Sequence, residues 1–154
     1  MTKTVLNISD LIVRTGSGYP KPYDTEVKGR SNVALGNPFG ITQFGANITT
    51  LEPGAWSSQR HWHLNEDELV YAIEGEMVIV DDTGRHPFKP GQCAGWKANT
   101  PNAHCIVNEG SSNAKFLVVG TRAIIEAANY PDIDMKYSRD EHGPKFTRKD
   151  GSSF

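Results

Sequence analysis

The middle of the chain alternates between hydrophobic and polar positions in short runs that glycine and proline interrupt. Residues 41–50 show this most clearly, because Phe44, Ala46 and Ile48 alternate with small or polar residues. A period of two predicts a half-buried strand. Residues 77–80 are hydrophobic at every position, which indicates a strand packed on both faces. Further short strands are expected over residues 56–63, 68–73, 92–97, 104–108 and 115–119.

Turn signals separate these runs. Pro53-Gly54 and Pro90-Gly91 each end a predicted strand, and residues 81–84 read as a hairpin turn. Many short strands at close spacing predict an all-β sandwich or barrel. The runs that are hydrophobic on both faces favour a closed barrel, since closure hides the strand edges. A chain of 154 residues suits a single domain, residues 1–154.

The two ends differ from this central part, residues 40–121, which we expect to form the barrel core. Residues 1–39 contain a stretch rich in glycine and proline and are expected to form an N-terminal arm lying over the barrel. Residues 122–154 form a C-terminal extension, in which residues 123–129 could make a helical turn or two. The polar, charged tail from Arg139 onward is predicted to be disordered. Four hydrophobic residues would dock the part before it: Tyr130, Ile133, Met135 and Tyr137.

Charge and composition exclude several classes of partner. The net charge is −2 and the lysines and arginines form no basic stripe, which argues against nucleic acid and anionic membrane as partners. No hydrophobic segment near the start is long enough for a signal peptide, so we expect a cytoplasmic protein. Cys93 and Cys105 do not make a disulfide framework and are expected to be partly buried thiols.

Three of the five histidines fall into a spaced pattern with a carboxylate. His61 and His63 are two positions apart, so on a strand both imidazoles point to the same face. Glu68 begins the next hydrophobic run, and His104 begins a later one. Together these side chains could hold one divalent ion, and the donor set suits Fe, Mn, Ni, Zn or Cu better than Mg or Ca. The identity of the metal stays open.

Strand parity decides among the neighbouring acids. Glu68 has the parity of Val70 and Ala72, which suit a barrel interior, whereas Glu66 lies in the preceding turn and is the second candidate.

Parity also selects candidates for substrate binding. Ser57 and Gln59 share the face of His61 and His63, so we expect them to line the cavity. Arg60 points outward on a regular strand. Asn108 has the parity of His104, and we interpret it as a residue that bonds to a turn or to backbone.

This spacing resembles the motifs of the cupin superfamily. The first cupin motif is matched by Gly54, His61, His63, Glu68 and Gly75, with six residues rather than five between Gly54 and His61. The second is matched by His104 and Asn108, while residues 99–101 replace its Pro-x-Gly. Segments in both flanks, including Tyr130–Asp134, are similar to small bacterial single-domain cupins of unassigned function.

The resemblance implies a jelly-roll barrel, one divalent transition metal (Fe, Mn, Ni or Zn) and a homodimer. It does not imply one reaction, because cupins include oxygenases, isomerases, decarboxylases, lyases, sensor domains and storage proteins. We expect a metalloenzyme acting on a small oxygen-rich metabolite, such as a keto or hydroxy acid, a diketone or a sugar. No general base stands out near the predicted metal, so a non-catalytic module that binds or senses a small ligand is the alternative. A barrel without metal is a third possibility.

Overall fold

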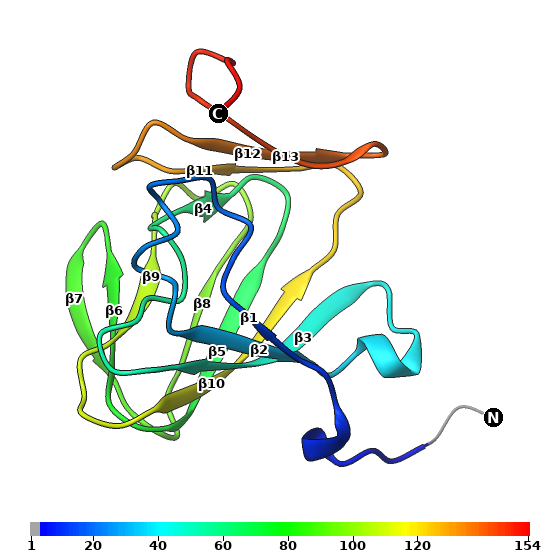
Figure 1. Ribbon diagram of the computed structural model, residues 1–154, viewed down its shortest axis with the longest axis vertical. Coiled ribbons are helices and arrows are strands. Elements are labelled where there is room, and N and C mark those ends of the chain that lie inside the picture. The colour runs from blue at the N-terminus through cyan, green and yellow to red at the C-terminus, as the bar shows by residue number, and fades with distance from the viewer. Residues whose placement is uncertain (1–3) are drawn as a thin grey trace.

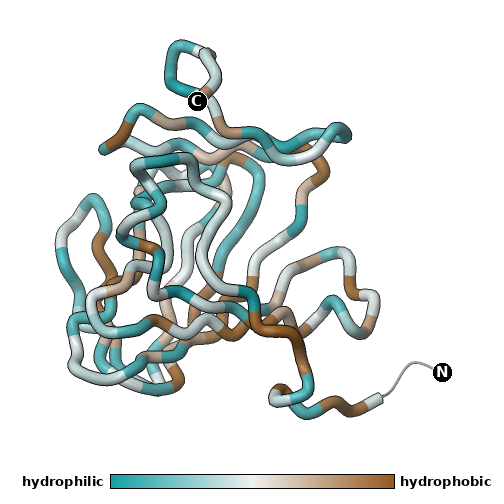
Figure 2. The backbone as a smooth tube through the Cα atoms, in the orientation of Figure 1, coloured by the Kyte–Doolittle hydropathy of each residue, from teal (hydrophilic) through white to brown (hydrophobic). Residues whose placement is uncertain are grey.

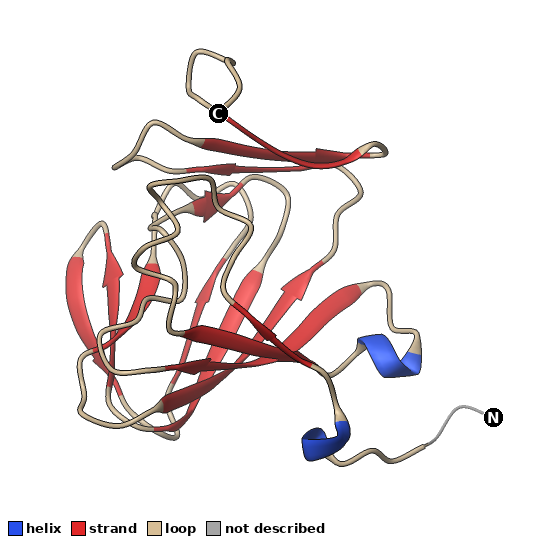
Figure 3. Cartoon of the chain, viewed as in Figure 1, coloured by secondary structure: helices blue, strands red, loops and turns tan. Residues whose placement is uncertain are grey.

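The computed structural model describes residues 4–154, and strands make up most of the ordered elements (Figures 1 and 3). The main sheet has six strands in the order β1 (Val13–Thr15), β2 (Arg30–Ala34), β3 (Phe44–Leu51), β10 (Ala114–Thr121), β5 (Glu68–Glu74) and β8 (Cys93–Trp96). A three-stranded sheet has the order β7 (Gly84–Phe88), β6 (Met77–Asp81) and β9 (Cys105–Asn108). Two 3₁₀ turns, η1 (Ile8–Asp10) and η2 (Asn37–Phe39), lie near the N-terminus.

A four-stranded sheet lies across one end of the molecule, as Figure 1 shows at the top of the view. Its strands are β13 (Gly143–Thr147), β12 (Lys136–Asp140), β11 (Glu126–Asn129) and β4 (Trp62–His63). The result is the predicted all-β, jelly-roll-like fold. Full closure, which we expected from the sequence, is not reached, because the strands divide among three sheets.

The hydrophobic core lies between the main sheet and the three-stranded sheet. Leu51, Val70 and Phe116 from the main sheet pack in one cluster with Ile79 and Ile106. Each such buried side chain contributes about 1.5–3 kcal/mol to the stability of the fold.

β5 shows the predicted period of two, since Val70 and Ala72 are fully buried while its alternate residues face outward. These outward residues are hydrophobic and about half exposed: Leu69, Tyr71 and Ile73. The homodimer stays a prediction.

Gly75 allows the turn between β5 and β6 to approach β10. Its φ is +84°, a left-handed value that favours glycine. A Cβ atom at this position would lie 2.7 Å from the Cα of Ala114, which is too close for any other residue. The glycine found in the sequence motif is therefore required by this local packing.

The second strand predicted from the sequence is shorter than expected. Within residues 56–63, only Trp62–His63 form a strand, β4. Two isolated bridges hold the rest of this segment, Trp56 to Val107 and His61 to His104.

The two ends of the chain also differ from the predictions. The helical turn predicted for residues 123–129 is wrong, because residues 126–129 form β11. The disordered tail is also wrong, since β12 and β13 extend the same sheet. In Figure 2 the tube over β12 and β13 is mostly in the hydrophilic colours. The sequence of this segment therefore contains few hydrophobic positions that would indicate a strand.

Backbone pairing and a small second core hold the C-terminal extension. Met135, Tyr130 and Ala128 are buried there, with Tyr19 and Phe146 packed against them. Residues 1–39 contribute more than an arm over the barrel, because β1 and β2 pair into the main sheet. No helix among residues 4–154 combines the length and the apolar character that crossing a bilayer requires.

Candidate metal centre

The backbone brings His61 and His104 face to face. Each donates its N–H to the other's carbonyl oxygen, at 3.1 and 2.8 Å, which makes an isolated antiparallel bridge. Directly paired residues on neighbouring strands hold their side chains close together. The ring centroids of the two imidazoles accordingly lie 5.4 Å apart.

Glu68 completes a group of three. It is the first residue of β5, and one ligand atom from each of His61, Glu68 and His104 lies within 4.8 Å of the others. The Nε2 atom of His104 is 3.8 Å from Glu68 Oε1. Segments that are far apart in the sequence thus converge on one point, as the metal hypothesis requires.

His63 lies at the edge of this group. Its Nε2 atom is 3.0 Å from His61 Nε2 and 3.4 Å from Glu68 Oε2. The His-x-His pair therefore points to one face, as strand parity predicted, but only His61 belongs to the tight group with His104.

The ring orientations fit a cation. The Nδ1 atoms of His61 and His104 lie 2.9 and 3.2 Å from the backbone carbonyls of Gln59 and Asn102. A carbonyl only accepts, so these contacts place the proton on Nδ1 and leave the Nε2 lone pair toward the centre. His104 Nε2 is buried without any hydrogen-bond partner. A buried atom of this kind is costly unless something binds it, and a divalent ion would do so.

Burial and neighbouring charges shape the protonation of the cluster. Burial, together with His63 and His104, lowers the pKa of His61 to about 3, so its ring is neutral and able to ligate. Burial alone would raise the pKa of Glu68, but the adjacent His104 and His63 outweigh it and hold that pKa below its usual range. An ionised carboxylate beside a neutral imidazole is the donor set that a divalent transition ion takes.

Two neighbours that the sequence pattern did not reveal lie against these side chains. Trp96 pairs with Glu68 across β5 and β8, and its indole stacks on the ring of His104 at 3.6 Å between centroids and 8° between planes. Glu126 is fully buried, and its Oε1 lies 3.4 Å from His63 Nδ1. Carboxylates placed behind a metal-binding histidine orient its ring and raise its basicity.

A cavity of about 190 Å³ opens beside the group, and Ser57, Tyr19 and Arg30 line it together with His61, Glu68 and His104. Ser57 has the position predicted for it, although its Oγ already accepts from the N–H of Ile106 at 2.9 Å. Gln59 does not line this cavity. Its Nε2 instead donates to the carbonyl of Tyr23 and to Glu26 Oε2, which anchors the N-terminal segment.

The remaining candidates lie outside the group. Glu66 accepts from the N–H of Ala123 at 2.9 Å and pairs with Arg139, which leaves Glu68 as the carboxylate that faces the histidines. Arg60 points outward and binds Asp132 and Asp82. Asn108 is buried and bonds to backbone groups, which confirms its interpretation.

Comparison with known proteins supports the resemblance found in the sequence. A family model described as the cupin domain matches residues 47–120. A crystal structure from Silicibacter pomeroyi, described as a sugar phosphate isomerase from a cupin superfamily, is 47% identical in sequence. The match covers 97% of this chain and 96% of that one, with a TM-score of 0.94.

More distant structures share the fold. One from Acidithiobacillus ferrooxidans is 26% identical, with 81% of this chain and 80% of that chain covered and a TM-score of 0.74. The polyketide cyclase RemF from Streptomyces resistomycificus is 20% identical, with 77% and 79% covered and a TM-score of 0.61. No protein of curated function matches the sequence.

Proposed function

Because this chain belongs to the cupin superfamily, we propose that it is a divalent-metal-dependent enzyme that isomerises a sugar phosphate. The observation that supports metal binding is the convergence of His61, Glu68 and His104, in which His104 Nε2 is buried without a hydrogen-bond partner. The Silicibacter protein supports the reaction class, since it is described as a sugar phosphate isomerase and matches almost the whole chain at 47% identity.

The proposed ligands are His61, Glu68 and His104, with His63 as a fourth at the edge of the group. A bound divalent ion would supply a Lewis acid for a substrate carbonyl and its neighbouring hydroxyl. Tyr19 lines the same cavity, and burial raises its pKa, so its hydroxyl stays protonated and can donate a hydrogen bond to a substrate oxygen. Ile106, Phe116 and Val118 also line the cavity and give it an apolar wall.

The direct test is metal-dependent turnover. Chelator-treated protein would be reloaded separately with Mn, Fe, Ni and Zn and mixed with a panel of aldose and ketose phosphates, with interconversion followed by NMR. We expect turnover only with metal, and its loss in His61→Ala and His104→Ala. His142→Ala is the matched control, because that side chain is 84% exposed and far from the cluster in sequence. Failure of every sugar phosphate to react in the metal-loaded protein would contradict the proposal.

One observation favours a second candidate, a module that binds a small ligand without converting it. Among the residues that line the cavity, Glu68 is the only carboxylate, and it is also a proposed metal ligand. Proton transfer between carbon atoms needs a base within reach of the substrate. Strong thermal stabilisation by a metabolite that is never converted would favour this alternative.

A further inference from the structure

A second hollow lies beside the metal cavity on the inner face of the main sheet. Its volume is about 280 Å³, and three arginines and three asparagines line it: Arg14, Arg30, Arg122, Asn32, Asn37 and Asn47. No carboxylate lines it. Arg30, Thr49 and Val118 border both hollows, so the two are neighbours with a shared wall.

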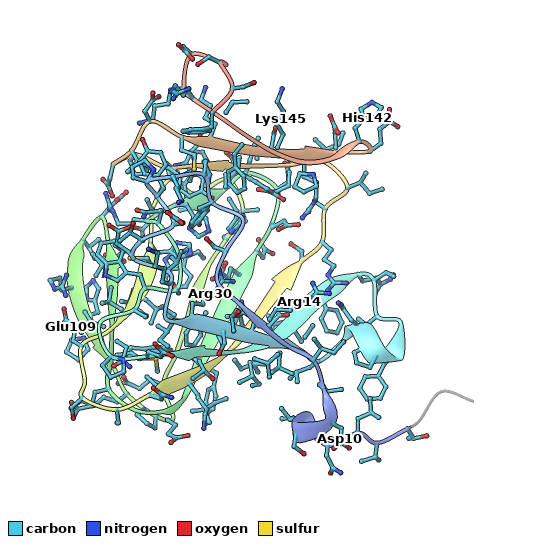
Figure 4. All side chains as sticks on the ribbon, in the orientation of Figure 1. Asp10, Arg14, Arg30, Glu109, His142 and Lys145 are labelled. Carbon is cyan, nitrogen blue, oxygen red and sulfur yellow. The ribbon has the colours of Figure 1, made fainter. Side chains whose placement is uncertain are left out.

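The strand register explains how these residues meet. Arg14 on β1 is paired with Asn32 on β2, and Asn32 is paired with Thr49 on β3. Farther along, Asn47 on β3 is paired with Val118 on β10, which is itself paired with Val70. Because directly paired residues share a face, the hollow and the buried side of β5 belong to one continuous surface. Figure 4 labels Arg14 and Arg30 beside β1 and β2.

The three arginines lack the carboxylate partners that the other arginines have. The sequence contains seven arginines. Four of them form ion pairs with aspartate or glutamate: Arg60, Arg85, Arg139 and Arg148. No carboxylate of residues 4–154 lies within 4.0 Å of the guanidinium groups of the other three. The unpaired arginines of this acidic chain therefore gather in one place.

Neutral acceptors fix two of these guanidinium groups without neutralising them. When the Asn32 amide is oriented to satisfy its neighbours, its oxygen accepts from Arg30 Nη2 at 2.8 Å and from Arg30 Nε at 3.1 Å. Its nitrogen then donates to Thr49 Oγ1 at 2.7 Å. Arg122 donates to the carbonyl of Ile41 at 3.1 Å and to Asn37 Oδ1 at 2.7 Å.

Such an arrangement is unfavourable for the free protein. Burial lowers the pKa of Arg30, which shows that its charge is poorly solvated. Arg30 is the partly buried member and has the charge of Glu68 nearby, whereas the side chains of Arg14 and Arg122 are exposed, and the three like charges repel one another across the hollow. An anion in the hollow would remove both costs, and preorganised guanidinium groups bind phosphate oxygens strongly.

We propose that Arg14, Arg30 and Arg122 form a phosphate subsite that holds the phosphoryl end of the substrate while its sugar end enters the metal cavity. The proposal rests on the proposed function for the identity of the sugar, but not for the anion itself. A phosphate dianion suits the pocket better than a carboxylate, because its three free oxygens can meet three separate guanidinium groups. Arg30, on the shared wall, would set the orientation of the ligand.

The test uses inorganic phosphate and chelator-treated, metal-free protein, so that the metal cannot bind the anion. Isothermal titration calorimetry at constant ionic strength is the measurement, since salt screens such contacts. We expect binding to the wild type and affinity weaker by about tenfold or more in Arg122→Ala, as for loss of one charge-assisted hydrogen bond. Arg14→Ala is the second variant, because that side chain is exposed and makes no ion pair, so we expect its removal to have little effect on stability.

Arg85→Ala is the matched control. It removes the same charge from an exposed ion pair with Glu109 on the β6–β7 hairpin and should leave phosphate affinity unchanged. Absence of phosphate binding, or unchanged affinity in both Arg14→Ala and Arg122→Ala, would overturn the subsite. Tighter binding of acetate or succinate than of phosphate would overturn the assignment of the anion.

The subsite and the proposed function can fail separately. If phosphate binds and depends on the arginines while no sugar phosphate reacts, the subsite stands and the isomerase proposal falls. If metal-dependent turnover occurs on unphosphorylated sugars and phosphate does not bind, the enzyme stands and the subsite falls. In an active enzyme, Arg122→Ala should raise the KM for a sugar phosphate without changing that for the matching free sugar.

Discussion

Glu126 Oε1 lies 3.4 Å from His63 Nδ1, and the same carboxylate accepts from the N–H groups of Leu64 and Asn65 at 3.0 and 2.9 Å. One buried acid on β11 thus fixes the chain that follows the His-x-His pair and faces the ring of its second histidine. The C-terminal sheet is therefore part of the support of the candidate metal centre, since β11 also pairs directly with β4.

Replacing this acid should weaken metal binding. In Glu126→Gln the amide can accept from only one of the two backbone N–H groups and carries no charge beside His63. Loss of an outer carboxylate of this kind typically lowers metal affinity about 10–100-fold. Competition between the protein and a chromophoric chelator for zinc measures the change. Glu141→Gln is the control, because that side chain is 82% exposed, and equal affinities in the two variants would contradict the prediction.

Asp81 should make stability depend on acid pH. Burial alone would raise its pKa, but hydrogen bonds from Thr83 outweigh this and lower the pKa to about 2. A depressed folded pKa stabilises the protein above the ordinary value of 3.8, and the contribution is lost as the pH falls from 3.8 toward 2.

In Asp81→Asn the free energy of unfolding should therefore depend less on pH between 3.8 and 2. At neutral pH it should be lower than in the wild type by about 1 kcal/mol. Urea unfolding at pH 6, 4 and 3 measures both effects. Asp140→Asn at the exposed end of β12 is the control, and an equally steep acid decline in Asp81→Asn and the wild type would refute the prediction.

Met135→Ala tests whether the C-terminal extension folds with the rest of the chain. Met135 is fully buried against Tyr130 and Ala128. Truncating such a side chain costs about 2–5 kcal/mol through lost burial and the cavity that remains. Chemical unfolding gives the cost, and limited proteolysis reports opening of residues 130–154. Ile125→Ala, at a side chain that is 67% exposed, should change stability by less than about 0.5 kcal/mol. A similarly small effect of Met135→Ala would mean that the extension unfolds independently.

The two cysteines should differ sharply in reactivity. Cys93 is exposed, whereas Cys105 is 1% exposed and burial raises the pKa of its thiol to about 12. The thiolate is the reactive species, so Cys105 is nearly inert in the folded protein. A thiol-reactive disulfide reagent should titrate one thiol in native protein and two after denaturation. Cys93→Ser should abolish the fast reaction, and rapid labelling of that variant would show that Cys105 is accessible.

Much of the candidate site was predictable because its signals are local. His61 and His63 share strand parity, Glu68 has the parity of the buried Val70, and Gly75 marks a turn that tolerates no side chain. The same reasoning failed at the C-terminus, where β12 and β13 are hydrophilic strands. β12 pairs with β11 and β13 with β12, which satisfies the backbone groups while about half of the side chains stay exposed, so hydrophobic periodicity carries little signal there.

By itself, the sequence determined the β-rich architecture, the alternation of buried and outward residues along β5 and the residue types able to bind a metal, since each depends on neighbours within a few positions. Only the tertiary structure decided that Glu126 supports His63, that Trp96 stacks on His104 and that three unpaired arginines share one hollow. These relationships join residues from distant strands. They depend on how the strands align and cross in space. A local pattern of hydrophobic and polar positions does not specify which side chains from distant strands come together.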